Sequence, residues 1–452
     1  MRASAARRAA LKVITRVRER SAFAHETLDT VLSSTRIEPR DAALATRLAY
    51  GAIATRGTLD EAVARSLDEG TVLEPRVADA LALGAYELLY ARTPSHAAVS
   101  ETVELVREFR PRATGLANAV MRRIVKAAET FPWGNPDTDN AALARLHGHP
   151  RWLAELWIEQ LGRAAATEIM AANNEPAPLY LAMLGIHPDS EVVEWLAEDG
   201  ADPSPGPLPA SLVAGAAAAT RRARALKDGD VLVMDAGAQF AVHAVSPSPG
   251  DALVEIGAGR GGKTLLLAAL ARRAGGPAAE IAAVDLHAFK LESLSEGAAK
   301  AGFAEVRTIV ADATAARADV GVADKSADAV LIDAPCSGLG TLRRPPDRRW
   351  RAQRDEIETL ALLGEQLLGR AARLVKPGGC VVYSTCTIAK RENAEVIEGF
   401  LASPDGAEFR IETLIGYVPD EWAKFVTPEG YFQSLPAQDG PDGHFVARLV
   451  RA

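Results

Sequence analysis

Apolar side chains recur at every third or fourth position over the first 130 residues, which is the period of an amphipathic helix. The stretches 11–17 and 81–89 carry the clearest examples. Glu69-Gly70 interrupts the pattern, and Thr93-Pro94-Ser95 interrupts it again with a side chain suited to cap the next helix. We therefore expect about six helices that bury a core of their own.

A different pattern begins near residue 227, where short apolar runs alternate with helical periods. The runs predict strands at 253–256, 281–284, 306–310, 329–332 and 380–383. Helices are expected between them at 265–273, 290–301 and 356–374. This alternation predicts an α/β fold with a mostly parallel, doubly wound sheet.

The residues between these two regions mix both patterns. We expect a linker at 131–150, a helix at 152–161, a strand at 179–184 and a helix at 191–198. The chain is thus expected to hold an all-helical domain at 1–130, a linker with a small α/β connector at 131–226, and a catalytic domain at 227–452.

Composition excludes several classes of protein. Of the 452 residues, 48% are hydrophobic and 24% are charged, which is ordinary for a globular chain. No apolar stretch is long enough to cross a membrane, and the start lacks the apolar core of a signal peptide. The three cysteines have no C-x-x-C spacing, so we expect reduced thiols, no metal site and a cytoplasmic location. The oligomeric state is not predicted.

The net charge and the local charge clusters give opposite indications about a nucleic-acid partner. The net charge of −8 argues against a nucleic-acid partner, but residues 2–20 carry seven Lys or Arg against one Glu. Residues 343–354 carry six Arg against one Asp, and guanidinium groups beside an aromatic ring suit RNA. A solvated charged surface is the alternative. The expected RNA-binding residues are Arg343, Arg344, Arg348, Arg349 and Trp350.

A glycine-rich segment, residues 257–264, follows the first expected strand and opens a helix. It satisfies both G-x-G-x-x-G and G-x-x-x-x-G-K-[ST], so the motif alone does not distinguish a dinucleotide or adenosyl site from a triphosphatase. Asp285 and Asp312 end the next two strands, where carboxylates suit ribose hydroxyls and an adenine amino group and would repel a triphosphate. Helix capping is the alternative role for each Asp.

Two cysteines also follow expected strands. Cys336 lies in Asp333-Ala-Pro-Cys-Ser-Gly, and Cys386 lies in Tyr383-Ser-Thr-Cys-Thr. Open α/β sheets carry their chemistry past the carboxyl ends of strands, and a cysteine thiolate is a strong nucleophile. Cys380 falls inside a strand and is expected to fill the core.

These segments together resemble the bacterial NOL1/NOP2/Sun family of RNA 5-methylcytosine methyltransferases, and within it the 16S rRNA branch (RsmB, Sun or Fmu). The resemblance also covers 233–239 and 442–449, and residues 1–130 look like the NusB-type RNA-binding domain of that branch. The matching stretches are 331–340, 343–350, 375–379, 383–387 and Glu392-Asn393.

The resemblance implies a Rossmann-like S-adenosylmethionine methyltransferase domain that methylates cytosine C5 in RNA, with 16S rRNA as the expected partner. It implies that Cys386 attacks C6 of the base, that Cys336 assists release, and that Asp333 hydrogen-bonds the N3/N4 edge. The implied cofactor-binding residues are Glu255, Gly257, Ala258, Gly259, Arg260, Gly261, Gly262, Lys263, Asp285, Asp312 and Asp333.

The chain departs from the family pattern at four places. Glu255 replaces an Asp, Gly257 a Cys, Arg260 a Pro and His444 an aromatic residue. The replacements at 255, 257 and 260 are expected to affect the affinity for the cofactor and to leave the chemistry of the two cysteines unchanged. Three alternatives remain open: a non-catalytic RNA-binding or assembly factor, a methyltransferase for tRNA or another rRNA, and a nicotinamide oxidoreductase or nucleotide triphosphatase.

Overall fold

The computed structural model describes residues 3–20, 22–35, 37–315, 320–436 and 440–452. It contains two compact units, one formed by Met1–Pro176 and Leu342–Arg354, the other by Ala177–Thr341 and Asp355–Ala452. These units do not break at the expected boundaries of 130 and 226, because residues 131–176 and the arginine-rich segment both pack with the first helices. No helix among the described residues is long and apolar enough to cross a membrane.

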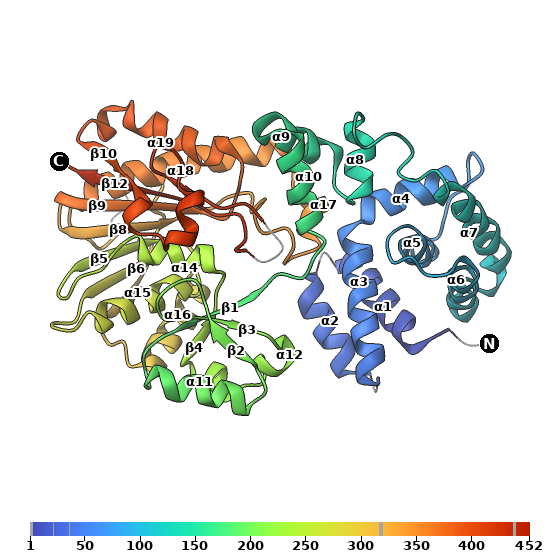
Figure 1. Ribbon diagram of the computed structural model, residues 1–452, viewed down its shortest axis with the longest axis horizontal. Coiled ribbons are helices and arrows are strands. Elements are labelled where there is room, and N and C mark those ends of the chain that lie inside the picture. The colour runs from blue at the N-terminus through green and yellow to red at the C-terminus, as the bar shows by residue number, and fades with distance from the viewer. Residues whose placement is uncertain (1–2, 21, 36, 316–319, 437–439) are drawn as a thin grey trace. The chain divides into compact units, whose positions relative to one another are not determined.

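The first unit is helical throughout (Figure 1). Its helices are α1 (Ala5–Arg20), α2 (Ala24–Ser33), α3 (Pro39–Ala54), α4 (Arg56–Arg65), α5 (Pro75–Leu89), α6 (Ser95–Phe109), η1 (Pro111–Ala113), α7 (Thr114–Ala128), α8 (Asn140–Leu146), α9 (Arg151–Leu161), α10 (Arg163–Ala172) and α17 (Arg348–Arg351). Helix α8 lies inside the expected linker, which is a correction: Asp139 caps it by accepting from Ala141 N.

Helix α5 is the centre of this unit because ten of its 15 residues are buried. Its two buried carboxylates meet arginines from neighbouring helices. Asp79 pairs with Arg18 and Arg56, and Glu87 pairs with Arg7. These ion pairs neutralise charges that would otherwise be costly inside the helical core.

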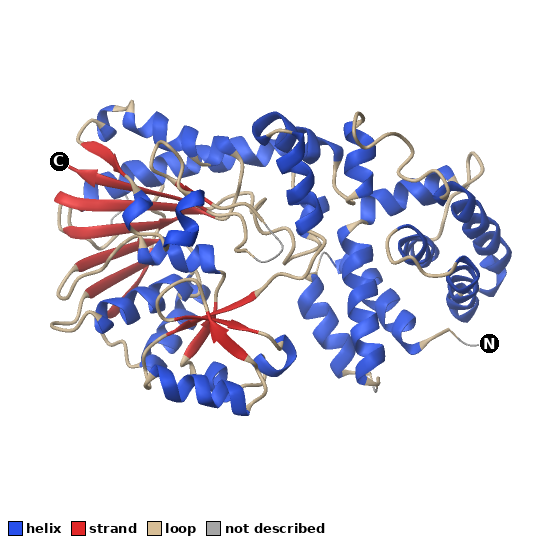
Figure 2. Ribbon diagram, viewed as in Figure 1, coloured by secondary structure: helices blue, strands red, loops and turns tan. Residues whose placement is uncertain are grey.

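The second unit is built on one large sheet (Figure 2) of strand order β10-β12-β9-β8-β5-β6-β7, with β11 paired to β12. Strands β9, β8, β5, β6 and β7 are parallel, while β12 runs antiparallel to both of its neighbours, β9 and β10. The sheet is thus mostly parallel, as predicted, with an antiparallel edge. The strands are β5 (Ala252–Ile256), β6 (Glu280–Asp285), β7 (Val306–Val310), β8 (Ala327–Asp333), β9 (Val375–Thr385), β10 (Phe409–Glu412), β11 (Phe432–Gln433) and β12 (Phe445–Arg451).

Alternate side chains of this sheet enter two apolar cores. Leu253 and Leu331 face α14 (Ala236–His243), α15 (Gly262–Arg273) and α16 (Ala288–Ala301). Val254 and Ile332 face α18 (Arg354–Leu374) and α19 (Ala394–Leu401). Helices on both faces bury the central strands completely, which explains their continuous apolar runs.

A small antiparallel sheet of order β2-β3-β1-β4 completes the second unit and corresponds to the connector. Its elements are β1 (Leu179–Met183), α11 (Asp189–Glu198), β2 (Pro203–Pro205), β3 (Ser211–Ala214), α12 (Ala217–Thr220), α13 (Arg224–Asp228) and β4 (Val231–Val233). Short 3₁₀ turns are η2 (Lys390–Glu392), η3 (Pro404–Gly406), η4 (Leu414–Gly416) and η5 (Asp420–Phe425).

Candidate active site

The carboxyl ends of β8 and β9 bring the two cysteine motifs together. Asp333 ends β8 and pairs in register with Ser384 of β9. Beyond that pair, Ala334 N donates to Ser384 O at 2.9 Å, so the two chains leave the sheet side by side. Cys336 and Cys386 therefore lie at one edge of the sheet, as the strand assignments predict.

The two thiols are in direct contact. Their Sγ atoms are 3.5 Å apart, and Cys386 N donates to Cys336 Sγ at 3.4 Å. The hydrogen bond from Cys336, ahead of opposing burial, lowers the pKa of Cys386 to about 7. The same hydrogen bond, followed by burial, raises the pKa of Cys336 well above its ordinary value. Cys386 is thus the thiol of the pair that ionises near neutral pH, while Cys336 keeps its proton there.

A buried carboxylate joins the loops that carry the two cysteines. Glu392 is 1% exposed and accepts from Ser337 N at 2.6 Å and from Ser337 Oγ at 2.5 Å. It also accepts from Thr387 Oγ1 at 3.0 Å. Next to it, Asn393 donates to Thr387 O at 3.0 Å. The sequence identified Glu392-Asn393 only as part of a motif. The structure shows that Glu392 is buried and that it connects the two cysteine loops.

Asp333 is paired with a lysine of the glycine-rich segment. Lys263 Nζ lies 2.6 Å from Asp333 Oδ2. Burial on its own would lower the pKa of Lys263, but Asp333 outweighs it and raises that pKa. The lysine therefore stays cationic beside the thiolate, and it offsets the negative charge that Asp333 places near Cys386.

The glycine-rich segment is a tight turn fastened to its neighbours. Gly257 has φ +83°, and a Cβ there would lie 2.4 Å from Asp333 O, so glycine is the residue that fits. Gly259 N donates to Asp285 Oδ2 at 2.9 Å, and His287 N donates to Asp285 Oδ1 at 2.8 Å. A carboxylate has about four acceptor sites, so Asp285 keeps capacity for a ligand.

Other expected cofactor residues differ in accessibility. Glu255 is 1% exposed, and Thr264 donates to it; burial raises its pKa to about 8. It joins β5 to α15 and does not reach the surface, which corrects its expected cofactor contact. Asp312 is exposed and accepts from Thr314 N at 2.9 Å. Arg260 is also exposed, with its guanidinium 5.9 Å from the centre of the Phe289 ring.

Three exposed apolar side chains beside these carboxylates were missed by sequence reasoning. Leu286 directly follows Asp285, Phe289 opens α16, and Val310 ends β7. Each is more than half exposed, which is unusual for large apolar residues. Apolar surface next to Asp285 and Asp312 fits an adenosine, whose base is flat and whose ribose offers hydroxyl donors. The available signal was a large apolar residue within four positions of each Asp, Leu286 and Phe289 after Asp285 and Val310 before Asp312.

The arginine-rich segment is placed inside the helical unit. Arg349 is 0% exposed and donates to Ala54 O, Gly148 O, Asn173 O and Asn174 Oδ1. Trp350 Nε1 donates to Ala54 O at 2.8 Å. Both side chains hold the segment against α3 and the loop before α9. The complete burial of Arg349 corrects its expected RNA contact, whereas that of the half-buried Trp350 stays a prediction. Arg343 is also buried, while Arg344 and Arg348 are half-buried.

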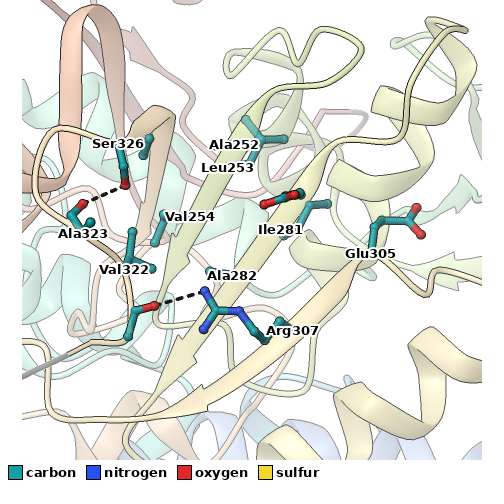
Figure 3. A pocket seen from close by; sticks show the side chains of 13 residues that line it. Ala252, Leu253, Val254, Ile281, Ala282, Glu305, Arg307, Val322, Ala323 and Ser326 are labelled. Atoms are coloured by element: carbon teal, nitrogen blue, oxygen red, sulfur yellow. Dashed lines mark hydrogen bonds between the residues drawn. The ribbon is translucent and has the colours of Figure 1, made fainter.

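One cavity of about 430 Å³ lies away from this chemistry. Figure 3 shows Ala252, Ile281, Glu305 and Arg307 around it, at the amino ends of β5, β6 and β7. Arg307 Nη2 donates to Gly321 O at 3.1 Å across one side. Because ligands of such sheets bind past the carboxyl ends of strands, this cavity is separate from the candidate active site.

Comparison with known proteins agrees with this geometry. The family described as "16S rRNA methyltransferase RsmB/F" matches residues 242–450, and the NusB family matches residues 4–126. The probable ribosomal RNA small subunit methyltransferase B of Synechocystis sp. is 31% identical over 99% of both chains. Ribosomal RNA small subunit methyltransferase B of Klebsiella pneumoniae is 30% identical over 92% of this chain and 91% of its own.

Solved structures show the same fold. The crystal structure of PH0851 matches with a TM-score of 0.78 and 24% identity over 99% of this chain and 98% of its own. NSun6 from Pyrococcus horikoshii, solved with SFG, an S-adenosylmethionine analogue, matches with a TM-score of 0.55 and 19% identity over 67% of this chain and 98% of its own. The chain belongs to the RsmB/F family of methyltransferases: it is an RNA methyltransferase that uses S-adenosylmethionine and carries an N-terminal NusB-family domain.

Proposed function

We propose that this enzyme methylates C5 of a cytosine in 16S rRNA, through a covalent bond between Cys386 and C6 of the base. The observation that carries the proposal is the thiol pair: Cys386 has a lowered pKa and lies 3.5 Å from a protonated Cys336. Cytosine C5 is a weak nucleophile, and a thiolate that adds to C6 turns the C5–C6 edge into an electron-rich enamine.

The cofactor supplies an electrophilic methyl group when it is bound. The residues that would hold it are the backbone N–H groups of the glycine-rich segment, Asp285 and Asp312, with Leu286 and Phe289 against the base. The positive charge of Lys263 would offset the negative charges of the Asp333 carboxylate and the Cys386 thiolate during the reaction. Asp333 would then accept a hydrogen bond from the exocyclic amine of the cytosine.

Cys336 would take part in the second half of the reaction. Its raised pKa depends first on the hydrogen bond to Cys386. Once Cys386 is a thioether, that bond to a thiolate no longer exists, so the pKa of Cys336 falls. Cys336 can then release its own proton to water and accept the proton from C5. The electron pair of the C5–H bond forms the C5=C6 double bond, and the Cys386–C6 bond breaks with its electron pair returning to Cys386.

Labelled S-adenosylmethionine and unmodified 16S rRNA test the proposal, with the methylated base mapped by bisulfite sequencing. We expect label at a cytosine, present with the intact enzyme and lost in Cys386→Ala. Label on another base would overturn the cytosine assignment. Label on tRNA or 23S rRNA alone would overturn the 16S assignment. RNA binding without any methyl transfer would support an assembly factor instead.

A further inference from the structure

His444 directly precedes β12, and Cys386 directly follows β9. In the antiparallel pairing of β12 with β9, Phe445 is opposite Thr385 and Val446 is opposite Ser384. One step further along the same register places His444 opposite Cys386. The backbone supports this placement, because Gly340 N donates to Cys386 O and Gly443 N donates to Gly340 O.

The imidazole is buried and its backbone is held in place. His444 is 4% exposed. Its backbone N–H donates to Ser434 Oγ at 2.9 Å, and its backbone carbonyl accepts from Ser434 N at 2.9 Å. The ring packs on Gly237, where a Cβ would lie 2.5 Å from His444 Cδ2. A side chain at 237 would displace the ring, so this glycine gives the imidazole its space.

Asp235 gives the imidazole a charged partner. His444 Nε2 lies 3.2 Å from Asp235 Oδ1. The carboxylate is itself fixed at the start of α14, where it accepts from Gly237 N at 2.9 Å and from Asp442 N at 3.2 Å. Three segments, the start of α14, the start of β12 and the end of β9, therefore meet at this side chain.

The charged groups around His444 favour its cation. Asp235, Cys386 and Asp442 face it, and they outweigh burial so that the pKa of His444 is raised. The groups around Cys386 are Cys336, His444, Lys263 and Asp333, of which only Asp333 raises the thiol pKa. The imidazolium and the thiolate each favour the charged form of the other.

We propose that His444, held by Asp235, is a positioning residue that stabilises the thiolate of Cys386. The proposal rests on the proposed function only in taking Cys386 as the nucleophile. It gives this chain a Cys–His–Asp arrangement at a place where the family it resembles has an aromatic side chain, and it makes the histidine a second source of positive charge beside Lys263.

The test is the pH dependence of Cys386 alkylation by iodoacetamide, read by peptide mass spectrometry so that each cysteine is followed separately. Only the thiolate reacts, so the midpoint reports the pKa of Cys386. We expect His444→Phe to raise the midpoint by about one unit, which is about tenfold slower alkylation below it. An unchanged midpoint in a variant with unchanged thermal stability would overturn the proposal.

Asp235→Asn is the second variant, and the direction in which it shifts the alkylation midpoint of Cys386 depends on whether His444 takes part. Asparagine keeps an acceptor for Gly237 N but removes the negative charge. If His444 carries the effect, its pKa falls and the Cys386 midpoint rises; if His444 has no part, removal of a nearby negative charge lowers the midpoint or leaves it unchanged. Because alkylation needs neither RNA nor methyl transfer, failure of the proposed function would leave this result intact.

Discussion

At the scale of single residues, the two cysteines follow similar strands, yet their pKa values are shifted in opposite directions. The contact between the two sulfurs lowers the pKa of Cys386 and raises that of Cys336, and the positive charges of His444 and Lys263 lower the pKa of Cys386 further. The sequence singled out Cys336 and Cys386 because each follows an apolar strand, and the family resemblance implied their roles and that of Asp333. The opposite pKa shifts were not predictable, since the two cysteines are 50 residues apart and meet each other, Lys263 and His444 only after folding.

Glu392→Gln should weaken the connection between the two cysteine loops. The carboxylate accepts three hydrogen bonds, whereas a glutamine oxygen has two acceptor sites, so at least one bond is lost. We expect a loss of about 2 kcal/mol in urea unfolding and a lower kcat with little change in KM for RNA. Glu395→Gln, exposed three residues later, is the matched control. Equal kcat and stability for both variants would contradict this role.

At the scale of elements, strands in the middle of the sheet were predictable and its antiparallel edge was not. The interior strands β6 and β8 contain the apolar runs 281–284 and 329–332, and β5 is apolar apart from Glu255. β12 includes Arg448 and Arg451, whose charges break the run in the sequence. Folding supplies their partners, because Glu412 accepts from Arg448 and Glu408 pairs with Arg451 at 2.5 Å. Those contacts join segments about 40 residues apart, which local patterns do not report.

The buried contact between β5 and α15 predicts a pH effect. The pKa of Glu255 is raised to about 8 by burial, so the folded state keeps a proton that the unfolded chain releases above its ordinary pKa of 4.5. Stability from this group is full below about pH 4.5 and falls as the pH rises toward 8. Glu255→Gln should therefore gain stability relative to the native chain as pH rises through this range.

Urea unfolding of both proteins at several pH values measures the effect. Glu280→Gln, at the exposed start of β6, should change stability equally at every pH and serves as the control. A constant difference between Glu255→Gln and the native chain across the range would mean that Glu255 is ionised in the folded protein.

At the scale of the whole molecule, the chain is discontinuous. After the Cys336 loop it leaves the catalytic unit, packs residues 342–354 into the helical unit, and returns at Asp355. The sequence predicted an RNA-binding patch there because six arginines lie close together. Their partners are far along the chain, with Gly148 about 200 residues away from Arg349, so the burial of Arg349 and the half-burial of Trp350 were not visible.

Arg349→Ala should destabilise the helical unit. The guanidinium is buried and donates to four oxygens, which would be left without this donor. We expect a loss of about 3 kcal/mol, seen as faster hydrogen exchange of the amides in α3 and α10. Arg354→Ala, at the exposed end of the same segment, should leave exchange unchanged. Unchanged exchange in both variants would contradict the structural role of the buried Arg349 side chain.

The central claim is that Cys386 bonds to the base while Cys336 allows release. The most direct measurement incubates Cys336→Ala with unmodified 16S rRNA and S-adenosylmethionine, then maps any covalent RNA–peptide adduct by mass spectrometry. The account predicts a denaturation-resistant adduct at Cys386, absent in Cys386→Ala, because the covalent bond forms but cannot break. An adduct at Cys336 in Cys386→Ala, or no adduct in either variant with methylation retained, would contradict it.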